Sequence, residues 1–132
     1  SILQEKQEQL QSAFTKLLPR ATQESPATLA SCIEAGLCLV SSPLTPDPER
    51  AAVLRKIFPK VEVVRVSGTT HPRAVFAAAR FCLLTRQVGI ADELRGRLPA
   101  ASPLWDSLTA LVKHHAAILH PPPPLTSGYT IH

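Results

Sequence analysis

The sequence contains no methionine and few aromatic residues: four Phe, one Trp and one Tyr in 132 positions. Five of these six lie among the apolar residues of predicted helices, which leaves no exposed platform for stacking nucleic-acid bases. The longest apolar run, Ala74 to Leu84, is interrupted by Arg80 and is far shorter than the ~20 residues that cross a bilayer. We therefore expect no membrane span. The start at Ser1 without methionine leads us to expect an excised piece of a longer protein.

Cysteine is scarce, with Cys32, Cys38 and Cys82 as its three occurrences. An odd, sparse set on apolar faces argues against a disulfide framework and predicts buried thiols in a reducing compartment, nuclear or cytoplasmic. The chain has no C-x-x-C or H-x-x-x-H pair. Adjacent His114 and His115 would point about 100° apart on a helix, so they cannot share one ion unaided. We expect no metal site and no cofactor.

Catalytic signatures are missing as well. The chain has neither a G-x-S-x-G turn nor a glycine-rich phosphate loop, and no motif pairs two carboxylates. Because no nucleophile is accompanied by a recognisable base, we expect a protein without enzymatic activity. The alternative that the residues leave open is a fragment of an α/β enzyme.

Proline, by contrast, is abundant, with 13 residues whose positions organise the chain. Four dipeptides place a residue that can cap a helix ahead of a proline suited to the first helical turn. Apolar residues at helical spacing follow each dipeptide and also occupy one side of residues 2–18. The four dipeptides are Ser25-Pro26, Asp47-Pro48, His71-Pro72 and Ser102-Pro103.

These signals predict a mainly α-helical fold of five to six helices, arranged as a helical bundle or a short HEAT-like helical array. We assign residues 1–120 to a single helical domain. Residues 121–132 open with four consecutive prolines, which favour an extended conformation, and we assign them to a proline-rich tail or linker.

The helix predicted from Pro72 to about Val88 is apolar nearly all round, which is typical of the most buried helix in a fold. We expect Phe76, Cys82 and Leu83 to be nearly inaccessible to solvent. Gly89 follows the predicted last residue and is expected to cap this helix.

One segment departs from the helical pattern. Residues 61–66 are rich in β-branched side chains and lie between Pro59 and Gly68. They predict a short extended connector after a helix that ends at Pro59. Residues 37–42 also read locally as a strand, and if both segments were strands the chain would contain an α/β unit. An α/β fold is therefore the alternative fold class.

The formal charge of +4 is unevenly distributed, because ten Lys or Arg but only three Asp or Glu lie between Arg50 and Arg97. We expect a non-catalytic protein–protein interaction or scaffold module of a larger intracellular protein, with an acidic segment on the partner. The alternative is a basic helical segment that binds nucleic acid. The sequence does not fix the oligomeric state. The predicted partner-binding patch consists of Arg55, Lys56, Arg73 and Arg80.

A proline-rich loop contains two candidate modification sites. Ser42-Pro43 and Thr45-Pro46 each place a hydroxyl directly before proline. A phosphate on either hydroxyl would add negative charge to the loop between two predicted helices.

Overall fold

The computed structural model describes residues 1–21 and 25–119, and these residues form six helices and no strand. The prediction of an all-α, bundle-like fold is therefore confirmed, and the α/β alternative is wrong. The predicted proline-rich tail, 121–132, lies outside the described residues. In chain order the helices are α1 (Ile2–Leu17), α2 (Pro26–Ser41), α3 (Asp47–Ser67), α4 (Pro72–Leu84), α5 (Val88–Arg95) and α6 (Pro103–Leu119).

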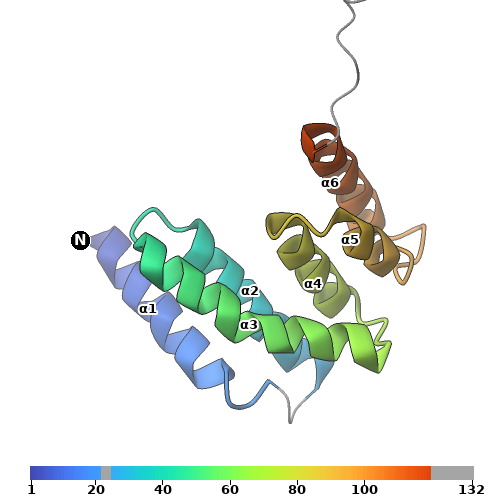
Figure 1. Ribbon diagram of the computed structural model, residues 1–132. Coiled ribbons are helices and arrows are strands. Elements are labelled where there is room, and N and C mark those ends of the chain that lie inside the picture. The colour runs from blue at the N-terminus through green and yellow to red at the C-terminus, as the bar shows by residue number, and fades with distance from the viewer. Residues whose placement is uncertain (22–24, 120–132) are drawn as a thin grey trace, which may run out of the picture.

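Two helices, α2 and α4, hold the arrangement together (Figure 1). Helix α2 packs against α1, α3 and α4, and α4 packs against α2, α3, α5 and α6. The first three helices lie at one end of the molecule and the last two at the other, as Figure 1 shows. Burial follows this order, because α2 and α4 each contribute eight buried residues, more than any other helix.

The helix starts follow the proline signals. Ser25 Oγ accepts a hydrogen bond from the Thr28 amide, and His71 Nδ1 accepts one from the Ala74 amide at 3.4 Å. Each cap satisfies a donor that has no partner inside its helix, and the proline that follows gives up no hydrogen bond. The expected cap at Asp47 is wrong in detail: Asp47 is already helical, and Pro46 occupies the cap position without a side-chain bond.

Helix α4 is as deeply buried as its composition predicts, with one exception. Cys82 and Leu83 are buried as expected, but Phe76 is only half-buried. The reason is helical geometry: residues three and four apart share a face, and Phe76 lies between Arg73 and Arg80 on the polar stripe of the helix. Its ring packs at the edge of the core instead of inside it.

The expected extended segment, 61–66, is wrong because α3 continues through Pro59 to Ser67. Val61 and Val64 are fully buried and continue the apolar spacing set by Ile57 one turn earlier. Burial of this continuous face outweighs the β-branched composition and the hydrogen bond that Pro59 cannot donate. The helix ends at Gly68, whose φ of +68° is a left-handed conformation that glycine adopts without strain.

Helix α4 ends at Leu84, earlier than predicted, and the expected cap Gly89 lies inside α5. The amide of Arg86 donates to the Leu83 carbonyl, and the amide of Gln87 donates to the Cys82 carbonyl at 2.7 Å. These two bonds define a Schellman motif, the usual end of a helix whose next residue is left-handed. Arg86 takes that position with a φ of 65° and is the one non-glycine residue with positive φ among the described residues.

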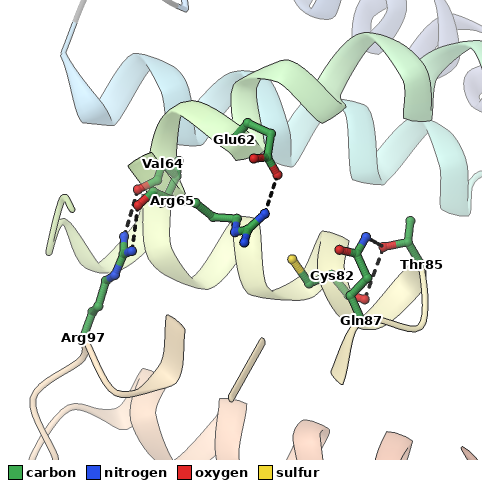
Figure 2. A network of polar contacts seen from close by, with 7 residues as sticks. All are labelled: Glu62, Val64, Arg65, Cys82, Thr85, Gln87 and Arg97. Atoms are coloured by element: carbon green, nitrogen blue, oxygen red, sulfur yellow. Dashed lines mark hydrogen bonds and ion pairs between the residues drawn. The ribbon is translucent and has the colours of Figure 1, made fainter. Parts of the chain in front are cut away.

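The carboxyl end of α3 is bound by Arg97, which follows α5 in the chain (Figure 2). Its Nη1 donates to the Val64 carbonyl at 2.8 Å and its Nη2 donates to the Arg65 carbonyl at 2.7 Å. A cation at this position also meets the negative end of the helix dipole. Arg97 therefore joins the last turn of α3 to the connection between α5 and α6.

Candidate partner-binding surface

The four residues of the predicted basic patch lie in different surroundings. Arg55 is exposed on α3, and Lys56 lines a hollow between α1 and α3. Arg73 is paired with Glu34 of α2 and donates to Ser31 Oγ at 3.1 Å. Arg80 lines a separate hollow between α2, α4 and α6.

Much of the positive charge between residues 50 and 97 is bound within the fold. The guanidinium groups of five arginines in this stretch donate hydrogen bonds or form ion pairs within the fold. These arginines therefore contribute to packing and to helix ends more than to a free basic surface. Arg95, for example, pairs with Asp92, donates to Thr109 Oγ1 and stacks 5.3 Å from the centroid of the Trp105 ring. The five are Arg50, Arg65, Arg73, Arg95 and Arg97.

The hollow at Arg80 combines apolar side chains with basic ones. An adjoining hollow shares Leu83, Leu84 and His115 with it, and Arg86 lines this second part. We call the two together the α4–α6 hollow. Half of its lining residues are leucines, and no acidic residue lines either part. Its lining comprises Leu37, Ser41, Arg80, Leu83, Leu84, Arg86, Leu111, His115, Ile118 and Leu119.

Two apolar side chains at the rim of the α4–α6 hollow are exposed to solvent. Leu84 has 47% of its surface accessible and Ile118 has 61%. Within residues 1–21 and 25–119, the guanidinium groups of Arg80 and Arg86 have neither an ion-pair nor a hydrogen-bond partner. An apolar surface rimmed by unpaired cations is suited to a ligand that carries both apolar and acidic groups.

Arg86 reaches this hollow from a costly backbone conformation. A residue with a Cβ in the left-handed region costs about 1 kcal/mol relative to glycine, and glycine is the usual residue at this position of a Schellman motif. Strain of this kind is common at functional positions. The neighbouring turn is fixed by Thr85, whose Oγ1 donates to the Phe81 carbonyl and accepts from Gln87 Nε2, and Figure 2 shows part of this network.

Sequence reasoning identified one member of this surface, Arg80, and missed Arg86, His115 and the leucines. Arg86 was placed inside a helix that ended at Val88, so its position in a turn was not evident. The contribution of α6 depends on how α6 packs against α4, which no local pattern reveals. One signal in the sequence could have indicated this surface. Arg80 and Leu84 are four residues apart, which places both on one face of α4.

In the part of the chain that the structure describes, Cys32 and Cys82 are buried, whereas Cys38 is exposed, so the expectation of buried thiols is wrong for Cys38. No three His, Cys, Asp or Glu side chains there are grouped as metal ligands. Burial raises the pKa of the Cys82 thiol to about 11, although the nearby Arg65 opposes this shift. Burial also raises the pKa of Cys32. Both thiols are therefore poor nucleophiles.

Comparisons with protein-family models, with curated proteins and with solved structures found no match to this chain. None of the helices described combines the length and the apolar character that crossing a bilayer requires. The protein is therefore classified by its fold alone, which is an all-α, bundle-like arrangement. Its function is argued from the surface described above.

Proposed function

We propose that this chain is a non-catalytic protein-interaction module, which binds an amphipathic, acidic segment of a partner protein at the α4–α6 hollow. The observation that carries the proposal is the combination of exposed Leu84 and Ile118 with the unpaired guanidinium groups of Arg80 and Arg86. Apolar side chains of the partner would cover the leucines, and its carboxylates would pair with the two arginines. The three free cysteines are consistent with a reducing, nuclear or cytoplasmic location.

A defined peptide provides the test. The probe is a synthetic peptide of about 20 residues, long enough for an appreciable helix, with leucines at helical spacing and glutamates on the opposite side. A second peptide carries lysine in place of every glutamate, and a third has the first composition in scrambled order. We expect the chain to bind the first peptide and to discriminate against the other two.

Charge reversal locates the site. The double variant R80E/R86E should weaken binding of the acidic peptide by about tenfold or more, because it replaces attraction by repulsion at the rim. The matched control is Arg55→Glu, which reverses an exposed arginine of α3 that does not line the hollow. Melting temperatures of all variants should change little, since exposed charges contribute only about 0–1 kcal/mol each.

Binding of nucleic acid is the competing function, supported by the exposed basic residues of α3 such as Arg55 and Lys56. A single-stranded oligonucleotide separates the two. Affinity for phosphates falls steeply with salt, whereas affinity for the acidic peptide should fall less, because half of the residues that line the hollow are leucines. Oligonucleotide binding that Arg55→Glu weakens, without binding of the acidic peptide, would replace our proposal.

A further inference from the structure

The loop between α2 and α3 contacts the first helix through two hydroxyl groups. Ser42 Oγ donates to Gln7 Oε1 at 2.6 Å, and Gln7 Nε2 donates to Thr45 Oγ1 at 2.7 Å. Ser42 and Thr45 each precede a proline, Pro43 and Pro46. One glutamine of α1 thus bridges both Ser/Thr-Pro dipeptides of this loop.

Helix α1 packs against the core through its carboxyl-terminal part, where Leu10 and Leu17 join Phe14. Phe14 is its one buried residue, and Ile2 and Leu3 at its start are 71% and 67% exposed. Its main packing partner is α2. Between α1 and α3 lies the hollow at Lys56, and Thr45 forms part of its wall. The bonds of Gln7 therefore supply a substantial part of what holds the amino-terminal half of α1 in place.

Of the two hydroxyls, Ser42 is the one that a modifying enzyme can reach first. Thr45 has 3% of its surface accessible, whereas Ser42 is partly exposed and is followed by exposed Pro43 and Leu44. The backbone at Ser42 is extended, with φ −72° and ψ 131°. An extended Ser-Pro dipeptide in an exposed loop is the substrate form of a proline-directed protein kinase.

We propose that Ser42 is a phosphorylation site and that its phosphorylation releases the amino-terminal half of α1 from the rest of the fold. The phosphoryl donor is a nucleoside triphosphate bound by the kinase. Ser42 Oγ forms a bond to the γ-phosphorus, and the bond from that phosphorus to the oxygen that bridges it to the β-phosphate breaks. The hydroxyl proton passes to a base of the kinase, and the nucleoside diphosphate leaves.

The phosphate removes the contact to Gln7 in two ways. The Ser42 oxygen loses the proton that it donates to Gln7 Oε1, and about two negative charges are added within hydrogen-bonding distance of that amide oxygen. A cation is also at hand: Arg50 Nη2 donates to the Ser42 carbonyl at 2.8 Å, and Arg50 Nε is buried without a hydrogen-bond partner within the described residues. The phosphate gains by pairing with Arg50 and not with Gln7. Once α1 has moved, Thr45 becomes accessible as well.

Two other Ser-Pro dipeptides in the chain provide matched controls. Ser25 and Ser102 accept backbone amides at the starts of α2 and α6, through Thr28 and Leu104 respectively. Negative charge at the start of a helix interacts favourably with its dipole. A phosphate on Ser25 therefore has the same charge and the same following proline as one on Ser42 but leaves α1 attached.

The test has two parts. First, the purified chain is incubated with a recombinant proline-directed protein kinase and magnesium ATP, and the modified residues are located by mass spectrometry; we expect Ser42 among them. Second, phosphoserine is installed at Ser42 or, as the control, at Ser25 during synthesis, and amide hydrogen exchange is measured. Phosphoserine at Ser42 should lower the protection of α1 amides by about tenfold or more, and α4–α6 amides should keep theirs. Phosphoserine at Ser25 should leave α1 unchanged.

Two variants test whether the effect of the phosphate depends on the contacts between Gln7 and the loop. Gln7→Ala should loosen α1 to a similar degree, and phosphoserine at Ser42 should then add little, because both changes remove the same contacts. Ser42→Ala should loosen α1 modestly without affecting α4–α6. Modification of Ser25 or Ser102 while Ser42 stays unmodified would overturn the proposal. So would unchanged α1 protection in the Ser42 phosphoprotein, or loss of protection throughout α2–α6.

Discussion

At the scale of single residues, Arg86 combines a backbone cost with an exposed charge. Its positive φ ends α4 through the two Schellman bonds, a task that glycine performs without a Cβ clash. Its guanidinium lines the α4–α6 hollow and has no partner among the described residues. Stability alone favours glycine at this position, and the proposed binding of an acidic segment favours arginine.

Arg86→Gly should therefore stabilise the fold by about 1 kcal/mol and weaken binding of the acidic peptide. Thermal unfolding and peptide titration measure the two effects. Arg86→Ala separates them, because alanine retains the strain and removes the charge: binding should weaken without a gain in stability. The control Arg55→Gly, in the middle of α3, should cost about 1 kcal/mol and leave binding unchanged. A stabilised Arg86→Gly variant with full affinity would remove Arg86 from the binding surface.

The buried thiol of Cys82 makes stability depend on alkaline pH. Burial raises its pKa to about 11 from the ordinary value of 9.0, so the folded protein holds this proton more tightly than the unfolded chain does. The contribution is fully present below pH 9 and is lost as the pH rises towards 11, at up to about 1.4 kcal/mol per pH unit. Denaturant titrations give the free energy of unfolding at each pH. Between pH 9 and 11 this free energy should fall more steeply with pH for the wild type than for Cys82→Ala. An equal pH dependence of the two unfolding free energies would show that the thiol is not protected from water.

At the scale of the helices, close packing between α1, α2 and α3 depends on Gly36. A Cβ at this residue would lie 2.6 Å from Ile57 Cγ2 and 3.1 Å from Phe14 Cε1. Both distances are shorter than van der Waals contact, and the neighbours belong to two different helices. The absence of a side chain at Gly36 is what lets these three helices approach.

Gly36→Ala should consequently destabilise the protein by about 1–3 kcal/mol through overpacking, despite alanine's higher helix propensity. Gly89→Ala is the matched control, because Gly89 is also helical but a Cβ there meets nothing within 4 Å. This second change should stabilise by up to about 1 kcal/mol. Chemical denaturation of both variants measures the contrast, and a loss of stability in both would contradict the packing argument.

Three of the four helix starts marked by proline were predictable from the sequence, whereas two helix ends were not. Ser-Pro and His-Pro carry the capping chemistry within adjacent residues, so local inspection finds them. The continuation of α3 past Pro59 depends on burial of Val61 and Val64, which is a property of the packed molecule. The end of α4 depends on an arginine in a glycine-like conformation, which composition does not indicate.

The proposed binding surface was predictable only in part for the same reason. Arg80 belongs to a polar stripe that the sequence shows, and it does line the α4–α6 hollow. The other predicted residues lie elsewhere, because α3 presents Lys56 towards α1 and α2 supplies Glu34 to pair with Arg73. Which helices share a surface is decided by packing between segments far apart in the chain.

At the scale of the whole molecule, α4 links the two ends of the helical arrangement. It packs against α2 and α3 on one side and α5 and α6 on the other (Figure 1). Its core residues belong to one continuous cluster with those of the other helices. Substitutions of buried residues in α4 should therefore destabilise the whole fold, and substitutions at its surface should not.

Two adjacent leucines test this expectation. Leu83 is buried in the core cluster, whereas Leu84 is an exposed residue at the rim of the hollow. Leu83→Ala should cost about 2–5 kcal/mol through the cavity that it leaves. Leu84→Ala should stay within about 0.5 kcal/mol of the wild type. The unfolding free energy of each variant is the measurement, and similar losses would indicate that Leu84 is also part of the core.

The packing of helices mainly against neighbours in the chain also has a consequence for the speed of folding. Most contacts within residues 1–21 and 25–119 join helices that are adjacent or one apart in sequence, so closing the intervening loops costs little entropy. Proteins of such low contact order typically fold in microseconds to milliseconds. The bonds from Arg97 to the end of α3 span more than 30 residues and can form only after α4 and α5 have docked. We therefore expect them to form on the native side of the transition state, where they would slow unfolding without accelerating folding.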